Sequence, residues 1–189
     1  MWINMQTIKV KAKAQKSKAT GKALAVSAMF AALITVTTAF IKIPAPMGYA
    51  HAGDSMVYLT ANVLPAPFSF IAAAIGGALA DIMSGYAVWA IPTAIIKALN
   101  VLPFFLIRLI LSKNNKDDKI LRLPIIAALV ATTAVTVGGY FIANALLYDV
   151  SAAIAETPFN IMQSIVGAVL FTALAAALDA VKFKQHILK

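Results

Sequence analysis

Long apolar runs, separated by five short breaks, are the feature that most constrains what this chain can fold into. Of its 189 residues, 61% are apolar and only 12% are charged, whereas a soluble domain carries roughly 25% charged residues. So many apolar side chains exceed what one small core can bury, and the surplus must face lipid. The composition therefore indicates an integral membrane protein with a single membrane domain.

The lengths of the apolar runs predict an all-α integral membrane protein, a bundle of six transmembrane helices. Prolines end two of the runs, because proline lacks a backbone donor and favours an extended chain before it. The second run is the shortest. We expect a basic tail over residues 1–21, a membrane domain over 22–182, a second basic tail over 183–189, and spans over 22–41, 54–64, 68–84, 91–111, 123–147 and 158–181.

The net charge of +9 arises from lysine-rich segments that lie outside the apolar runs. With a cytoplasmic N-terminus and six crossings, both tails and the break at 112–122 lie in the cytoplasm, as the positive-inside rule requires. Five or seven crossings would place one basic tail outside. Membrane lipids are the expected counter-charge, and the absence of aromatic or glycine-rich RNA-reading motifs argues against nucleic acid as a partner.

Several chemistries find no support in the sequence. The chain has no cysteine, which excludes disulfides and thiolate metal sites. No phosphate-binding loop is present, because Gly21-Lys22 is followed by alanine and lacks the required earlier glycine. Without paired carboxylates or a nucleophile motif, a membrane enzyme acting on a lipid or isoprenoid is a remote alternative. We therefore expect no catalytic residue, no metal and no cofactor.

Polar residues within the apolar runs gather in the half of the membrane that this topology places outside. Such residues are costly in lipid and usually face a cavity, a partner or one another. Asp81 and Lys97 fall at similar depth on antiparallel neighbours, so we expect a structural ion pair or two pocket residues. The candidate ligand-binding residues are Tyr49, His51, Asp54, Tyr86, Trp89, Lys97, Asn100, Asn144, Tyr148, Asn160 and Gln163.

Simpler explanations exist for single members of this set. Asp54 follows a glycine at the start of a helix, where N-capping alone would explain it. Tryptophan and tyrosine at this depth are typical of an interfacial belt, and Asn144 could bond only to a neighbouring helix. The inner half holds only Arg108 and Asp179, near ends from which they can reach the interface. This contrast favours a pocket that is open to the outside and closed below.

The first span carries a row of small residues. Ala28 and Ala32 lie four positions apart, with further alanines and a serine on nearby turns. This small-xxx-small pattern lets another helix approach closely. It suits packing within the bundle or contact with another subunit.

Four ordered motifs resemble those of the substrate-binding S components of energy-coupling-factor (ECF) vitamin transporters. They are GYAHAGD at 48–54, ADIMSGY at 80–86, PTAIIK at 92–97 and PFNIMQ at 158–163, and the resemblance covers nearly the whole chain after the tail. It is closest to the branch with riboflavin-type and hydroxymethylpyrimidine- or pyridoxine-type members. Asn100 departs from this branch, much of which has an acidic residue at that position.

This resemblance implies a multi-pass protein of the bacterial cell membrane that binds a vitamin at its outer face. It also implies partners, namely a transmembrane coupling subunit, which Ala28 and Ala32 would contact, and two cytoplasmic ATPase subunits. We expect a small heteroaromatic B vitamin or precursor, with hydroxymethylpyrimidine or pyridoxine favoured over riboflavin, folate or pantothenate. The chain itself would be a transporter subunit and no enzyme, because it lacks an ATPase motif.

Overall fold

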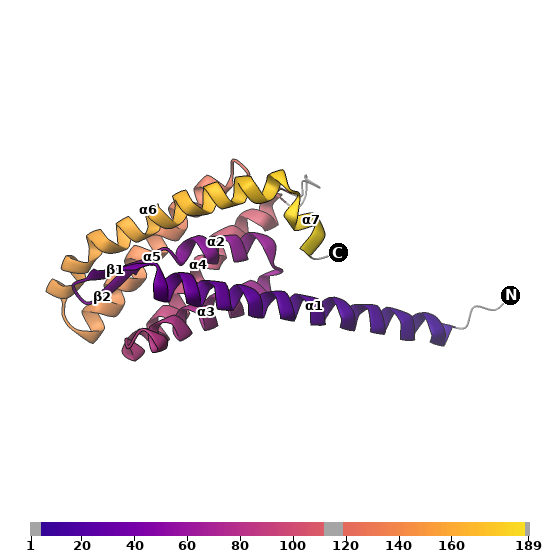
Figure 1. Cartoon of the computed structure of the whole chain (residues 1–189), viewed down its shortest axis with the longest axis horizontal. Coiled ribbons are helices and arrows are strands. Elements are labelled where there is room, and N and C mark those ends of the chain that lie inside the picture. The colour runs from indigo at the N-terminus through magenta and orange to yellow at the C-terminus, as the bar shows by residue number, and fades with distance from the viewer. Residues whose placement is uncertain (1–4, 112–118, 188–189) are drawn as a thin grey trace.

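The protein is a bundle of long helices with a two-stranded hairpin at one end (Figure 1). The computed structural model describes residues 5–111 and 119–187. Its elements in chain order are α1 (Met5–Phe40), β1 (Lys42–Ala45), β2 (Gly48–His51), α2 (Asp54–Val63), α3 (Ala66–Met83), the 3-10 turn η1 (Ala87–Trp89), α4 (Ala90–Leu111), α5 (Ile125–Leu147), α6 (Val150–Ala180) and α7 (Phe183–Ile187).

Five helices in the described part of the chain are long and apolar enough to cross a membrane: α1 from Gly21, α3, α4 with η1, α5 and α6. The prediction of an all-α membrane protein is therefore confirmed, with the hairpin as an addition. Helix α2 has 10 residues, about 15 Å at 1.5 Å per residue, which is roughly half of the hydrocarbon thickness. All of its residues except Met56 are buried, so it lies within the bundle.

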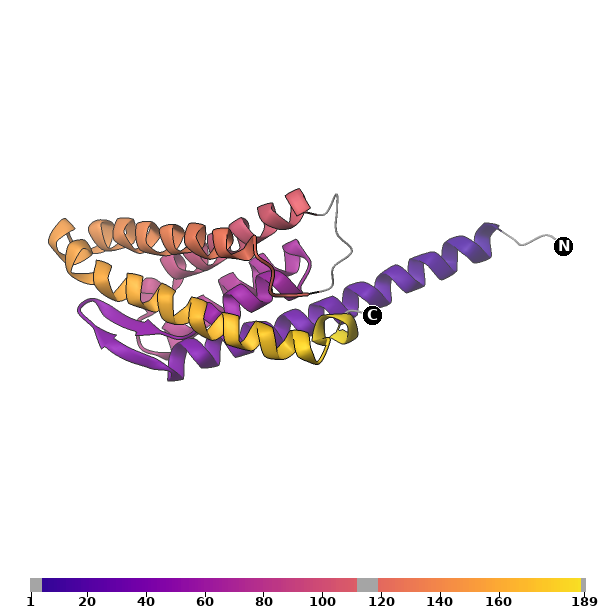
Figure 2. The same ribbon diagram turned by 90° about the horizontal axis from the view of Figure 1, so that it is seen from above.

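The turns between helices lie at two opposite ends of the bundle (Figures 1 and 2). The hairpin, the α3–α4 turn and the α5–α6 turn share one end, which we call the hairpin end. The α2–α3 turn and α7 lie at the other, the basic end. Helix α1 begins at Met5 and extends beyond the basic end, so the described part of the expected N-terminal tail continues the first span as one helix.

The segment after the first span forms the hairpin. Strands β1 and β2 pair antiparallel, with Lys42 opposite His51 and Ala45 opposite Gly48. The sequence predicted an extended chain here because of Pro44 and Pro46, and Pro44 lies in β1. Proline is tolerated in such a strand because a two-stranded sheet consists only of edge strands.

The predicted loop over 148–157 is wrong, because α6 already begins at Val150. Asp149 is its N-cap, and the carboxylate accepts a hydrogen bond from the Ala152 amide at 2.8 Å. The predicted start, Pro158, lies inside the helix. A proline there removes one backbone hydrogen bond and crowds the carbonyl of the preceding turn, but the helix continues through it.

Helix α2 packs against α1, α3, α4 and α6 and forms the centre of the core. Its Tyr58 meets Phe104 of α4 and Phe171 of α6, with ring centres 5.5 and 6.1 Å apart. All three rings are almost completely buried. Gly167 of α6 lets α2 approach, since a Cβ there would lie 2.8 Å from the Asp54 Cβ. We call the rings of Tyr58, Phe104 and Phe171 the aromatic plug.

Two charged residues close the basic end. Arg108 donates from Nη1 to the carbonyls of Ala61 and Leu64, both at 2.9 Å, at the C-terminus of α2. The Asp179 carboxylate accepts from the Ile120 and Leu121 amides at 2.6 and 2.8 Å. Both side chains remain partly exposed at this end, and their bonds are to the protein backbone. They satisfy backbone groups that helix ends and turns leave unpaired.

Candidate functional site

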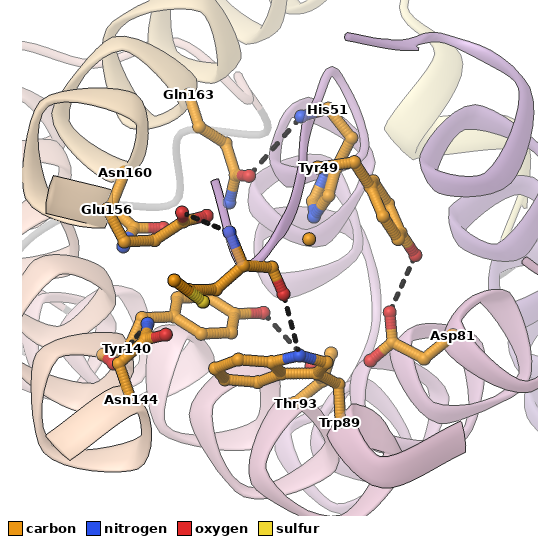
Figure 3. A pocket seen from close by; sticks show the side chains of 12 residues that line it. Tyr49, His51, Asp81, Trp89, Thr93, Tyr140, Asn144, Glu156, Asn160 and Gln163 are labelled. Atoms are coloured by element: carbon orange, nitrogen blue, oxygen red, sulfur yellow. Dashed lines mark hydrogen bonds between the residues drawn. The ribbon is translucent and has the colours of Figure 1, made fainter. Parts of the chain in front are cut away.

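A small cavity lies at the hairpin end, between β2, α3, η1 and helices α4 to α6 (Figure 3). It encloses about 30 Å³, which is room for one or two water molecules. Polar and aromatic side chains dominate its wall. The lining residues are Met47, Gly48, Tyr49, His51, Asp81, Trp89, Thr93, Tyr140, Asn144, Glu156, Asn160 and Gln163.

The tip of the hairpin closes the cavity. The Met47 amide donates to Glu156 Oε2 on α6 at 3.0 Å, and the Trp89 indole donates to the Met47 carbonyl at 3.2 Å. The Met47 side chain packs against the cluster that contains Trp89 and Tyr140. The hairpin is thus fastened to two sides of the cavity, and Met47 occupies part of the space between them.

Asp81 of α3 leaves one carboxylate oxygen without a partner in the cavity wall. The Tyr49 hydroxyl donates to its Oδ1 at 2.6 Å, while the buried Oδ2 has no hydrogen bond within the described structure. Burial, together with the bond to Asp81, raises the pKa of Tyr49 above its usual value, so this phenol stays protonated and can donate. A buried carboxylate oxygen without a donor is costly.

Two amides repeat this pattern on the opposite side. Asn144 of α5 donates from Nδ2 to the Tyr140 carbonyl at 2.9 Å, but its Oδ1 has no partner in the described structure. The Nδ2 of Asn160 on α6 is also buried without one. Asp81, Asn144 and Asn160 are 5%, 0% and 6% exposed. Buried polar groups are nearly always bonded, so these three atoms indicate a place for a ligand or water.

Aromatic rings complete the wall. Trp89 and Tyr140 lie with ring centres 5.9 Å apart, and Tyr49 lies 5.8 Å from His51. Thr93 and Tyr140 share a hydroxyl hydrogen bond of 3.2 Å. Apolar ring faces next to a few convergent polar atoms are typical of a site for a flat heteroaromatic molecule.

A buried ion pair supports the cavity from below. Lys97 of α4 donates to Asp54 Oδ1 at the start of α2, and neither side chain is exposed. Gln163 donates to Asp54 Oδ2 at 3.0 Å, and its Oε1 accepts from the His51 amide at 3.3 Å. The ion pair therefore positions Gln163 and, through it, strand β2.

Two expectations about these charges are wrong. Asp81 does not pair with Lys97, which pairs with Asp54 instead. Similar depth on neighbouring helices did not predict the partner of Lys97, because the central helix α2 places the Asp54 carboxylate next to it. N-capping does not explain Asp54 either, since Gly53 is the N-cap of α2 and no side chain bonds there.

His51 is a neutral donor. Its Nδ1 accepts from the Gly53 amide at 3.1 Å, so the ring proton lies on Nε2. Burial, reinforced by the positive charge of Lys97, lowers the pKa of His51 to about 3. Among residues 5–111 and 119–187, no group of three His, Cys, Asp or Glu side chains could hold a metal ion.

The structure brings part of the predicted site together. Five candidates do not line the cavity. Asp54 and Lys97 lie beneath it, and Asn100 lies deeper still, where it donates to Thr136 Oγ1 at 2.9 Å. Tyr86 and Tyr148 stack outside on Tyr49 and Trp89, at 5.1 and 6.1 Å. The candidates that line the cavity are Tyr49, His51, Trp89, Asn144, Asn160 and Gln163, together with Asp81.

Four side chains of the wall were not among the candidates: Met47, Thr93, Tyr140 and Glu156. Glu156 was assigned to a loop, although it precedes Asn160 by four residues and Gln163 by seven, which places all three on one helical face. Thr93 likewise precedes Lys97 by four. Helical spacing could have found both, whereas nothing in the sequence marks Met47, whose place depends on the hairpin.

The small residues of α1 divide between two faces. Ala28 and Ala32 are exposed, whereas Ser27 and Ala31 are buried in the bundle. The inward face packs tightly on α3, where Thr35 Oγ1 donates to the Gly76 carbonyl at 3.0 Å. Packing within the bundle therefore explains Ser27 and Ala31 and leaves Ala28 and Ala32 free to meet another helix.

Comparison with known proteins agrees with this architecture. Residues 18–180 match the family described as ECF-type riboflavin transporter, S component. A protein of Pyrococcus woesei, described as an uncharacterized protein in gap 3'region, is 31% identical over 141 residues, which cover 72% of this chain and 88% of that protein. No solved structure matches.

The five long apolar helices and the family match together show a multi-pass membrane protein that is a component of a transporter. The chain belongs to the family of ECF-type riboflavin transporter S components, which are the substrate-binding subunits of vitamin transporters.

Proposed function

We propose that the cavity binds a small heteroaromatic B vitamin or precursor, with hydroxymethylpyrimidine or pyridoxine favoured. The observation that carries this proposal is the set of three unpartnered polar atoms, on Asp81, Asn144 and Asn160, between aromatic rings. A flat ring would lie near Trp89 and Tyr140 while its edge groups complete the missing hydrogen bonds. The cavity has a volume of about 30 Å³, and a single ring needs less displacement of the hairpin than the larger riboflavin or folate, which favours one ring.

Binding requires the hairpin to move. Met47 holds the tip closed through its backbone bonds to Glu156 and Trp89, and a ring of vitamin size exceeds the present space. Opening would release the Glu156 carboxylate and the Trp89 indole N–H for the ligand. The protein would then close again over the bound molecule.

We further propose six crossings with both termini in the cytoplasm of a bacterial cell. The alternation of the turns between the hairpin end and the basic end supports this topology, with α2 as a short sixth element that needs no lipid contact (Figure 1). The cavity then opens to the outside. The aromatic plug and the Arg108 and Asp179 contacts would keep the cytoplasmic side shut.

Uptake would need a transmembrane coupling subunit and two ATPase subunits. The exposed Ala28 and Ala32 on α1 offer a flat surface to a helix of the coupling subunit. Ala28→Trp or Ala32→Trp should leave ligand binding intact and abolish uptake by the assembled transporter. Val130→Trp, on the exposed face of α5, is the control and should leave uptake unchanged.

Mass spectrometry of the ligand that survives purification, followed by titration calorimetry with B vitamins, tests the proposal. We expect one heteroaromatic vitamin to bind, and Trp89→Ala to weaken it at least about tenfold, since base–aromatic stacking is worth ~1–3 kcal/mol. Val88→Ala, at an exposed neighbouring position, should bind as the parent does. Failure of every B vitamin to bind the folded protein would refute the proposal.

A further inference from the structure

The wall of the cavity carries charge of only one sign. Two carboxylates line it, Asp81 from α3 and Glu156 from α6, and none of the described lining residues is a lysine or arginine. Figure 3 shows the two carboxylates on opposite sides of the cavity. The one histidine in the wall, His51, is neutral, as its hydrogen bond from Gly53 and its burial require.

The nearest cations lie behind the wall of the cavity and not in it. Lys97 is completely buried, with its Nζ 5.3 Å from the centre of the Tyr140 ring, and its charge is paired with that of Asp54. Lys42 is exposed on β1, with its Nζ 4.4 Å from the centre of the Tyr49 ring. The wall therefore remains acidic, and the carboxylates act on any ligand that enters.

The two carboxylates also have capacity for further donors. Asp81 Oδ2 has no hydrogen bond within the described structure, and Glu156 uses Oε2 for the Met47 amide, a bond that opening of the hairpin breaks. Asn144 Oδ1 adds another unpartnered acceptor. The donors of the wall are neutral: Asn160 Nδ2, the His51 Nε2–H and, once the hairpin opens, the Trp89 indole N–H. The cavity can thus bond to neutral edges of a ligand, but its charged groups are acceptors only.

We propose that this cavity selects a flat nitrogen heterocycle that is cationic or carries N–H and O–H donors on opposite edges. It rejects similar rings that bear a carboxylate or phosphate. A ligand cation forms a charge-assisted hydrogen bond with a buried carboxylate, whereas an anion meets like charge where water does not screen it. This inference rests on the proposed function and narrows its substrate, since it disfavours pantothenate and folate, which carry carboxylates.

Three compounds with one ring and different charge provide the test: pyridoxamine, pyridoxine and 4-pyridoxic acid. We expect dissociation constants of the purified full chain to rise in that order, with at least about tenfold between the ammonium and the carboxylate compound. Hydroxymethylpyrimidine should likewise bind at least about tenfold tighter than its phosphate ester. Calorimetry or competition with the co-purified ligand measures both ratios.

Variants connect the preference to the wall. Asp81→Asn and Glu156→Gln should each reduce the ratio between the ammonium and carboxylate compounds at least about threefold. Asp149→Asn removes an exposed charge at the same end of α6 and keeps an N-capping side chain, so it should leave the ratio unchanged.

The outcomes separate the two proposals. Equal or tighter binding of the carboxylate compound, an unchanged ratio in both wall variants, or binding of pantothenate alone overturns the charge selection and leaves the vitamin-binding role in place. Absence of binding by every compound contradicts the vitamin-binding role and the inference that depends on it.

Discussion

The hairpin end and the basic end of the bundle treat their polar groups in opposite ways. At the basic end, Arg108 and Asp179 bond to backbone groups, and the aromatic plug fills the space behind them. At the hairpin end, Asp81, Asn144 and Asn160 keep buried polar atoms without partners in the described structure. The charged side chains of the basic end are bonded without a ligand, whereas the Asp81 carboxylate at the hairpin end keeps an oxygen that is free of any bond to the described residues.

The two ends contribute differently to stability and to function. Completed bonds and close packing at the basic end stabilise the fold and exclude a continuous polar path. Unsatisfied atoms at the hairpin end cost free energy that a ligand can recover. The ion pair of Asp54 and Lys97 lies between the two ends of the bundle. It stabilises the fold by joining α2 to α4, and it supports the cavity by holding Gln163 in place.

The largest expected effect comes from breaking that connection. Lys97→Met leaves the Asp54 carboxylate buried without its counter-charge, which should lower the free energy of unfolding by about 3–5 kcal/mol. It should also weaken ligand binding, because Asp54 holds Gln163 at the cavity and is no longer held in place by Lys97. Denaturant titration in detergent measures the first effect. Lys42→Met, at an exposed position, should change stability by less than about 0.5 kcal/mol. A loss below about 1 kcal/mol for Lys97→Met would contradict the role of the pair.

The next effect concerns pH at the hairpin end. Because burial lowers the folded-state pKa of His51 to about 3, and the unfolded chain titrates near about 6.5, the unfolded state binds the extra proton between these values. The contribution of His51 to the free energy of unfolding is thus fully present above about pH 6.5, and it declines by about 1.4 kcal/mol per pH unit below that value.

Stability should therefore fall by about 2 kcal/mol between pH 7 and pH 5 through His51 alone. Unfolding curves at the two pH values measure the change. His51→Gln should remove this part of the pH dependence, while His186→Gln, at an exposed position on α7, should retain it. Equal slopes for the parent and His51→Gln would show that His51 is not buried as described.

A smaller effect separates binding from stability at the cavity. Asn144→Leu keeps the size of the side chain but removes an unpartnered oxygen, so stability should stay within about 1 kcal/mol of the parent. Ligand binding should weaken at least about tenfold, because an acceptor is lost. Calorimetry and unfolding are measured on the same sample. Ile142→Leu, on the exposed side of α5, is the control, and unchanged binding by Asn144→Leu would remove this residue from the site.

The smallest effect is expected at the plug. The Tyr58 hydroxyl is buried without a hydrogen bond in the described structure. Tyr58→Phe should therefore change the free energy of unfolding by less than about 1 kcal/mol, and we expect a small increase, because the variant removes an unsatisfied polar group. Tyr140→Phe removes the bond to Thr93 and should lower both stability and ligand affinity. A clear loss for Tyr58→Phe would reveal a partner for its hydroxyl.

Much of the fold could be predicted because lipid leaves few alternatives. Five apolar runs became long helices within a few residues of the predicted limits at most ends, and the short run became α2. The start of α6 was missed because Pro158 resembles a first turn, whereas Asp149 is the actual cap. Pro158 and Asp149 are both residues that often begin a helix, so the sequence alone did not show which of them begins α6.

The site was predicted less completely. Polar residues at one depth predicted Asn144, Asn160 and Gln163 as ligand-binding residues, and all three line the cavity; helical spacing would have added Glu156. Depth did not reveal which way each side chain faces. Asp54 and Lys97 were assigned to the ligand and to another partner, yet they bond to each other.

The sequence by itself determined that this chain spans a membrane, that its basic segments gather apart from its polar and aromatic residues, and that it resembles an S component. These properties follow from composition and order along the chain, because transfer into lipid depends on each segment separately. The tertiary structure was needed to show that Lys97 faces Asp54, that Met47 closes the cavity, and that three polar atoms of the described cavity wall have no partner. Those facts depend on how helices rotate against one another, and packing in three dimensions sets that rotation.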